Sequence, residues 1–139
     1  MIGKTIDRYK IVEKLGEGGM GEVYLAEDSS LHRKVALKFL PAYLEHDETA
    51  RKRFIREARS AAAIDHPCIC KIYEVGDVEG RHFIVMEYVE GETLKDKMSK
   101  GRVPLKEALR MASEAAEAIL QKISASRPRI TGNFPTREY

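Results

Sequence analysis

Cysteines, a signal-like segment and long apolar runs are scarce or missing in this chain. Cys68 and Cys70 are the only cysteines among its 139 residues. With one residue between them, they are too few for a zinc site and too close for an unstrained disulfide. No apolar run approaches the roughly 20 residues of a membrane-spanning helix, and Met1–Lys4 holds no apolar signal region. These absences predict a cytoplasmic protein with reduced thiols and no membrane segment.

The chain also has no large excess of positive or negative charge. The chain has 24 Lys and Arg residues against 22 Asp and Glu residues, a formal net charge of +2. This balance argues against a nucleic-acid partner and against an anionic membrane surface. Hydrophobic residues make up 43% and charged residues 33%, which is typical of a folded globular domain and not of a disordered chain.

Three glycines near the N-terminus, Gly16, Gly18 and Gly21, stand in G-x-G-x-x-G spacing. Glycine lets a backbone approach a bulky anion, and successive free N–H groups in such a turn suit phosphate oxygens. A plain hairpin turn is the alternative interpretation. A dinucleotide-binding fold would need a helix next, whereas residues 22–27 alternate as a strand does. A Walker loop is excluded because no Gly-Lys-Ser/Thr follows the glycines.

A second alternating strand is expected at residues 34–39. Val35, Leu37 and Phe39 would share one face of this strand, and Ala36 and Lys38 the other. A small residue and a lysine two positions apart on one face can cover a flat base and reach its phosphates. The two strands therefore predict a phosphate-binding unit built as strand, glycine loop and strand.

Two motifs of this chain resemble those of the protein kinases, and most closely those of the bacterial serine/threonine kinases: the glycine loop at residues 16–23 and the strand Val35-Ala36-Leu37-Lys38. The resemblance implies that ATP is the ligand, with magnesium as its companion ion in the family. The ATP-binding residues that it implies are Leu15, Gly16, Glu17, Gly18, Gly19, Met20, Gly21, Val23, Ala36, Lys38, Met86, Glu87 and Val89.

The resemblance also implies what these residues would do. The glycine loop would cover the phosphates, and Val23 and Ala36 would enclose adenine. Met86 matches the gatekeeper position of the family. Glu87 and Val89 would contact the adenine edge through their main chain, so their side chains carry little information.

Lys38 and Glu57 are the two catalytic residues that the resemblance implies. Lys38 would hold the α- and β-phosphates, and Glu57, on a helix expected at residues 47–64, would orient Lys38 through an ion pair. An acid beside the apolar stripe of a helix is costly unless it is paired. A solvated Glu57 bonded to Arg53 or Arg56 on the same helix is the alternative.

The implied fold is α+β and resembles a kinase N-terminal lobe, with a five-stranded antiparallel sheet and one packed helix. The strands are expected at residues 9–15, 22–27, 34–39, 69–78 and 82–89, the last of them at the centre of the sheet. A hinge and the first helices of an incomplete C-terminal lobe follow, at residues 94–100 and 105–123. The expected units are residues 1–89, 90–122 and an aberrant, disordered tail at 123–139.

The resemblance covers about residues 6–122 and then stops. The family's His-Arg-Asp, Asp-Phe-Gly and Ala-Pro-Glu motifs are absent from this sequence, and its last aspartate is Asp96. The catalytic base and the magnesium ligands of the family are therefore missing, and no metal-binding residue is predicted. The sequence favours a truncated or frame-shifted gene, or a fragment.

The predicted function is the ATP-binding portion of a serine/threonine protein kinase, inactive by itself. The intact family transfers the γ-phosphoryl group of ATP to protein hydroxyls, so protein substrates are implied for whole relatives. Two alternatives stay open: a non-catalytic fragment that docks on kinases, and a defunct product without a role. Residues 105–123 form an apolar helical stripe without an encoded partner, which predicts self-association.

Overall fold

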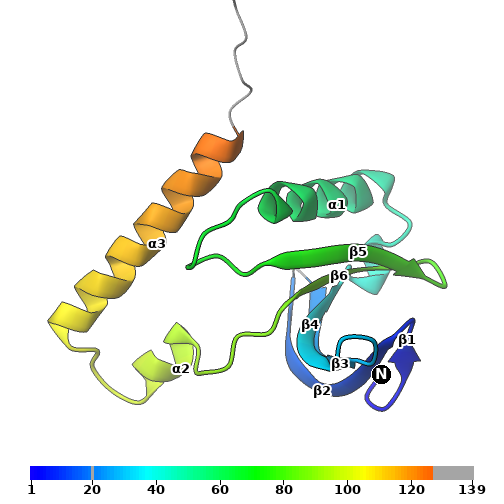
Figure 1. The fold of residues 1–139 in the computed structure, drawn as a ribbon, viewed down its shortest axis with the longest axis horizontal. Helices are drawn as coiled ribbons and strands as arrows, with labels where there is room; N and C mark the ends of the chain where they lie inside the picture. Colours follow the sequence, from blue (N-terminus) through cyan, green and yellow to red (C-terminus); the bar gives the residue numbers. More distant parts are fainter. Residues whose placement is uncertain (20, 127–139) are drawn as a thin grey trace, which may run out of the picture.

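A twisted antiparallel sheet carries one long helix on one face, and two further helices extend away from it (Figure 1). The computed structural model describes residues 1–19 and 21–126. The six strands of the described chain lie in the order β1-β2-β3-β4-β6-β5. The elements are β1 (Thr5–Ile6), β2 (Tyr9–Gly18), β3 (Gly21–Asp28), β4 (Arg33–Phe39), the 3-10 turn η1 (Ala42–Leu44), α1 (Glu48–Ala62), β5 (Ile72–Val78), β6 (Arg81–Glu87), α2 (Leu94–Ser99) and α3 (Leu105–Ser126).

The predicted alternation of β4 is confirmed, because Val35, Leu37 and Phe39 are fully buried on one face of the sheet. They belong to a core on the concave side of the curled sheet, which includes aromatic residues of β2, β3, β4 and β6; its buried members are Ile6, Tyr9, Ile11, Tyr24, Ala26, Val35, Leu37, Phe39, Phe83 and Val85. The opposite face of β4, with Ala36 and Lys38, is left for α1 and for the candidate site.

The sheet has six strands where the sequence predicted five. The additional strand, β1, contains only Thr5 and Ile6, which pair with Lys10 and Tyr9 of β2. A two-residue strand carries no readable alternation, so the sequence could not reveal it. The strand expected at residues 69–78 begins at Ile72 instead. The interior position predicted for residues 82–89 is confirmed, because β6 lies between β4 and β5.

Helix α1 packs on the sheet face opposite the aromatic core. Its first turn is capped by Asp47, whose side chain accepts hydrogen bonds from the N–H groups of Thr49 and Ala50. Phe54 and Ala58 are its buried residues. They form a second core with Leu40, which directly follows β4, and Ile84 of β6. Three partly buried residues pack against this core: Leu44, Ile72 and Met86. The predicted helix at 47–64 is thus confirmed, two residues shorter at its C-terminal end.

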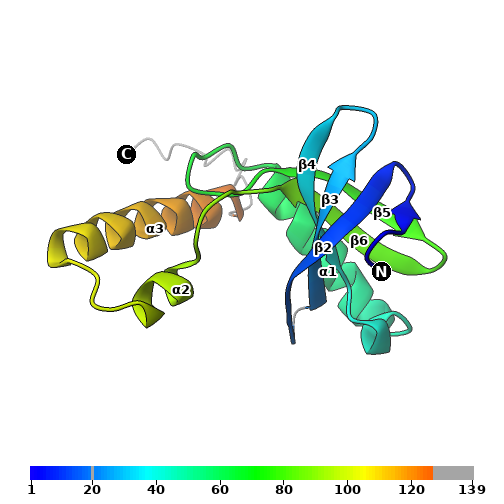
Figure 2. The same ribbon diagram turned by 90° about the horizontal axis from the view of Figure 1, so that it is seen from below.

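The chain after β6 leaves the sheet and forms α2 and α3 (Figure 2). Thr93 caps α2 through a reciprocal pair of hydrogen bonds with Asp96. Helix α3 runs to Ser126 and therefore enters the segment 123–139 that was expected to be disordered; residues 127–139 lie outside the described part. The far end of α3 comes to lie beside α1. Among the described residues, no helix is both long and apolar enough to cross a membrane.

Candidate nucleotide-binding site

The three glycines lie in the hairpin between β2 and β3, where Gly16 pairs with Val23 and Gly18 with Gly21. Gly21 has a φ of 111°, and a Cβ placed on it would lie 2.0 Å from the carbonyl oxygen of Phe39. Only glycine fits there. At Gly16 and Gly18 an added Cβ would meet no atom within 4 Å, so the fold does not require glycine at these two positions. Met20, a predicted binding residue, lies outside the described residues.

A small cluster of charges fixes the stem of this hairpin. The Lys14 Nζ atom donates to Glu17 Oε2 at 2.5 Å and to Glu22 Oε1 at 3.0 Å. The hydrogen bonds that Lys14 donates to Glu17 and, to a smaller extent, to Glu22 raise the pKa of Lys14, and the bond from Lys14 lowers the pKa of Glu22. Glu17, a predicted ATP-binding residue, therefore has its side chain committed within the hairpin. Sequence reasoning missed this cluster, although the hairpin register, which sets Glu17 opposite Glu22, could have indicated it.

The residues predicted to enclose adenine share one face of the sheet. Val23 of β3 lies directly opposite Lys38 of β4, and Ala36 lies opposite Met86 of β6. Directly opposed residues of antiparallel strands project to the same side. The structure thus brings these four residues together, and Leu15, on β2, is exposed at the approach to them.

Two residues predicted to contact the adenine edge through their main chain, Glu87 and Val89, lie at and beyond the end of β6. The Glu87 N–H donates to the carbonyl oxygen of Lys71 at 2.8 Å, and the Glu87 carboxylate accepts from the Lys71 N–H at 3.2 Å. Val89 lies in the irregular segment before α2, with its side chain 62% exposed. The N–H of Glu87 is therefore occupied by the neighbouring strand.

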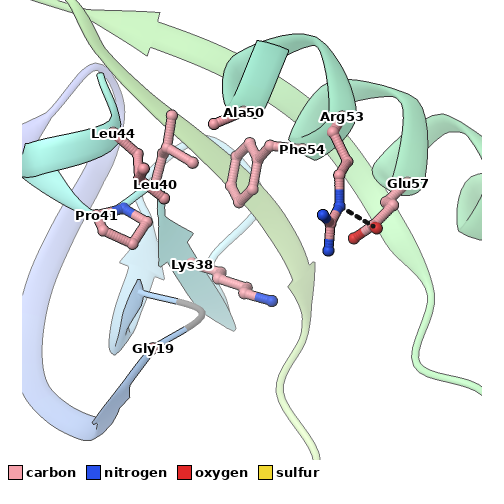
Figure 3. A pocket seen from close by; sticks show the side chains of 9 residues that line it. All are labelled: Gly19, Lys38, Leu40, Pro41, Leu44, Ala50, Arg53, Phe54 and Glu57. Carbon is pink, nitrogen blue, oxygen red and sulfur yellow. Dashed lines mark hydrogen bonds and ion pairs between the residues drawn. The ribbon is translucent and has the colours of Figure 1, made fainter. Parts of the chain in front are cut away.

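A cavity of about 170 Å³ lies between the glycine hairpin, β4 and α1 (Figure 3). Lys38 extends into it from β4, and Glu57 and Arg53 line it from α1. Its lining residues are Gly19, Lys38, Leu40, Pro41, Leu44, Ala50, Arg53, Phe54 and Glu57. The apolar residues of this set were not predicted as site residues, because their part in the cavity depends on how α1 packs.

The predicted ion pair between Lys38 and Glu57 is not formed in this structure. The Glu57 carboxylate instead faces Arg53, with 3.3 Å between Glu57 Oε1 and Arg53 Nε, and Arg53 stands between the two residues in Figure 3. Arg53 lies one turn away on the same helix, so it reaches Glu57 without any movement of α1 toward the sheet. The Glu57 side chain is 55% exposed, which corrects the expectation of a costly, half-buried acid.

The Lys38 side chain makes no hydrogen bond or ion pair with any residue in the described part of the chain. Its ammonium group therefore faces the cavity without an anionic partner. Together with the open space at Gly16 and Gly18, this arrangement suits a phosphate group placed between the hairpin and β4. The alternative in which Glu57 is bonded to Arg53 is the one that this structure adopts.

The protein kinase domain family matches residues 9–125 of this sequence. The chain belongs to the protein kinase family. It is 46% identical over 121 residues to the serine/threonine-protein kinase PrkC of Bacillus subtilis, covering 86% of this chain and 19% of that protein. It is 45% identical over 118 residues to the serine/threonine-protein kinase PknB of Mycobacterium tuberculosis H37Rv, covering 81% of this chain and 19% of that protein.

Solved structures of this kinase family share the fold. A double mutant of the Mycobacterium tuberculosis PknI kinase domain superposes with a TM-score of 0.81 at 31% sequence identity, covering 91% of this chain and 53% of that chain. This kinase chain spans about a fifth of the length of the curated relatives PrkC and PknB.

Kinases use ATP and magnesium, but the described residues contain no group of three or more His, Cys, Asp or Glu side chains that could hold a metal ion.

Proposed function

We propose that this portion of a protein kinase domain binds ATP between the glycine hairpin and β4. The observation that carries the proposal is the Lys38 ammonium group in the cavity beneath the hairpin, which has no anionic partner among residues 1–19 and 21–126. A lysine left without an anionic partner at a cavity is well placed to meet the charge of a phosphate. The open space above Gly16 and Gly18 adds room for the phosphate oxygens to approach the backbone.

The remaining contacts combine the sheet register with what the resemblance to kinases implies. Val23 and Ala36 would enclose the adenine ring on the face that they share with Lys38. Met86 would border the ring as gatekeeper, while the main chain of Glu87 and Val89 would meet its polar edge. Because the Glu87 N–H is already bonded to Lys71, its carbonyl group is the contact we assign to the ligand.

Glu57 would orient Lys38 only after a local rearrangement. Its carboxylate must leave Arg53, and α1 must bring it toward β4. An exposed pair between residues four apart on a helix is worth only about 0.3–0.5 kcal/mol, so its loss presents a small obstacle. We propose that nucleotide binding favours this exchange, because the phosphates would place Lys38 and attract Arg53 at the same time.

Affinity for ATP should be low. Each charge-assisted contact that a complete kinase adds is worth about 1.5–3 kcal/mol, and the described residues supply no metal ligands. Titration of the protein with a fluorescent ATP analogue, checked by calorimetry, measures the affinity. We expect a dissociation constant far weaker than micromolar.

Two variants on β4 make this titration specific. Lys38→Met should abolish most of the binding, whereas Lys34→Met should leave it unchanged, because Lys34 lies on the same strand but pairs with Glu90 at its far end. Equal binding by both variants, or micromolar binding by the parent protein, would contradict the proposal.

Phosphoryl transfer to protein serine or threonine, and the substrates that receive it, remain proposals for a longer protein of this family. A cytoplasmic location and self-association through residues 105–123 are likewise proposals. The second of these has a specific observation in its favour, because Leu105, Leu109, Ile119 and Ile123 of α3 are between 50% and 75% exposed. A fragment that docks on kinases through its lobe surface stays the alternative function.

A further inference from the structure

His82, the second residue of β6, is bonded to both ends of the segment that follows β4. At one end, the Leu40 N–H donates to the carbonyl oxygen of His82 at 3.0 Å. At the other end, the Glu45 carboxylate accepts from the His82 N–H at 3.1 Å and lies 3.0 Å from the ring nitrogen Nδ1. Residues 40–45 therefore form a loop that starts and ends on the same residue.

The Glu45 carboxylate is buried against the His82 ring. Its side chain is 8% exposed, and no lysine or arginine pairs with it in the part of the chain that the structure describes. A carboxylate that is buried without an opposite charge costs free energy. The burial of Glu45 therefore favours a positive charge on the ring.

The other ring nitrogen faces a second carboxylate. His82 Nε2 lies 3.1 Å from Asp77 Oδ2 of β5, whose side chain is 51% exposed. A neutral imidazole donates from one nitrogen only, so its other nitrogen would present a lone pair to a carboxylate oxygen. Both contacts are hydrogen bonds only when the ring is protonated on both nitrogens.

The charged residues beside these three in the sequence lie elsewhere. Arg81, which precedes His82, projects to the opposite face of β6 and pairs with Glu22 at 3.7 Å. His46, which follows Glu45, is exposed. Among residues 1–19 and 21–126, the two carboxylates are thus the charged groups that face the ring.

The loop at residues 40–45 builds one wall of the candidate nucleotide cavity. Leu40, Pro41 and Leu44 line that cavity (Figure 3). Pro41 also approaches the glycine hairpin, because a Cβ placed on Gly21 would lie 3.4 Å from Pro41 Cδ. Helix α1 begins three residues after the loop. The loop therefore connects His82 to the hairpin, the cavity and the start of α1.

We propose that Glu45, His82 and Asp77 form an ionic clamp, with His82 as an imidazolium, that fixes the loop between β4 and α1. We call these three residues the histidine clamp. His82 is a positioning residue, because it acts on the cavity only through the loop. The clamp itself does not depend on a ligand, whereas its effect at the cavity rests on the proposed function.

The clamp should weaken as the pH rises. Loss of the ring proton leaves Glu45 buried without an opposite charge and breaks one of the two ring contacts. The stability that the clamp contributes is therefore present below the pKa of a histidine in an unfolded chain, about 6.5, and is lost as the ring deprotonates in the folded protein.

The first test observes the ring directly and needs no nucleotide. Nitrogen-15 spectra of the full chain distinguish a doubly protonated imidazole from either neutral tautomer. We expect His82 to carry protons on both ring nitrogens at pH 7, with the exposed His46 as an internal reference. A neutral His82 ring at pH 7 would overturn the proposal.

Two carboxylate variants determine whether Glu45 holds the charge. Glu45→Gln removes the buried charge, so the His82 ring should lose its second proton at a lower pH than in the parent protein. Glu48→Gln is the matched control, because Glu48 is 65% exposed and pairs with Lys52; it should leave the titration unchanged. The same titration curve in all three proteins would contradict the clamp.

Hydrogen exchange tests whether the clamp fixes the start of α1. The Arg51 N–H, bonded to the Asp47 carbonyl oxygen, should lose protection by about tenfold or more in His82→Gln. His46→Gln, next to Glu45, is the matched control and should retain the protection of the parent protein. His82→Arg supplies a charge and donors for both carboxylates, so it should restore most of the protection. Equal protection in His82→Gln and the parent protein would overturn the positioning role.

Binding of the fluorescent ATP analogue to the same variants separates the clamp from the proposed function. Weaker binding in His82→Gln that His82→Arg restores would support an effect of the clamp at the cavity. Unchanged binding in His82→Gln would overturn that effect. If the parent protein binds no nucleotide, the proposed function fails, while the ring titration and the exchange of Arg51 still decide the clamp.

Discussion

The glycines of the β2–β3 hairpin, taken one residue at a time, have different physical roles. Gly21 holds a left-handed φ of 111° beneath the carbonyl of Phe39, whereas Gly18 has open space around its α-carbon. Gly21→Ala should therefore destabilise the protein by about 1–3 kcal/mol, while Gly18→Ala should change its stability by less than about 1 kcal/mol. Urea unfolding of the two variants measures the difference.

The same two variants separate folding from binding. Gly18→Ala places a methyl group where we propose that phosphate oxygens approach, so it should weaken binding of the ATP analogue while the fold stays intact. If Gly18→Ala binds as the parent protein does, the phosphates do not lie over this part of the hairpin.

Asp28 is the buried charged residue of the described core, with a fully buried side chain. Burial acts to raise its pKa, but hydrogen bonds from the N–H groups of Leu31 and Ser30, and the charge of Arg8, outweigh burial and hold the pKa below its usual value. A lowered pKa in the folded state contributes stability that is present above the unfolded pKa, about 3.9, and is lost as the pH falls through the folded pKa.

This sign predicts a specific acid sensitivity. The parent protein should lose stability as the pH falls below about 4, and Asp28→Asn should be less stable at pH 7 but show a smaller loss on acidification. Asp65→Asn, at an exposed position, serves as control. Urea unfolding at several pH values makes the comparison, and an unchanged acid profile in Asp28→Asn would show that Asp28 is not responsible.

At the level of the elements, the position of α1 relative to β4 decides whether Lys38 and Glu57 meet. In the structure Glu57 is held by Arg53, so the two candidate catalytic residues should be uncoupled in the protein without nucleotide. A double-mutant cycle with Lys38→Ala and Glu57→Ala should give an interaction free energy near zero in urea unfolding.

The corresponding cycle with Arg53→Ala and Glu57→Ala should give a small favourable coupling, of about 0.3–0.5 kcal/mol. A coupling above about 1 kcal/mol between Lys38 and Glu57 would mean that the ion pair implied by the family resemblance exists in solution, and that α1 lies closer to β4 than described.

Elements with a clear periodicity could be predicted from the sequence. The strand containing Val35, Leu37 and Phe39 alternates because one face is buried, and α1 begins where Asp47 can cap it. The two residues of β1 carry no such signal. The sequence offered both Lys38 and an arginine of the same helix as partners of Glu57. It could not decide between them, because the choice depends on how Phe54 and Ala58 pack the helix on the sheet, which no local pattern records.

At the scale of the whole molecule, the chain resembles the nucleotide-binding part of a kinase more than a complete catalyst. Its sequence contains no His-Arg-Asp or Asp-Phe-Gly motif, and positioning and charge stabilisation provide nearly all of this catalysis. We expect no transfer of label from γ-labelled ATP to a generic protein substrate. Steady incorporation that persists in Lys38→Met would mean that phosphoryl transfer proceeds without the residues named here.

The central claim is that ATP binds between the glycine hairpin and β4, and amide chemical shifts measured during titration with ATP test it most directly. The account predicts progressive shifts at Gly16, Gly18 and Lys38 and in residues 86–89, saturating only at high nucleotide concentration. The turn at residues 29–32, at the far end of β3 and β4, should stay unchanged. Shifts confined to that turn or to α2 and α3, or no shifts at any concentration, would contradict the claim.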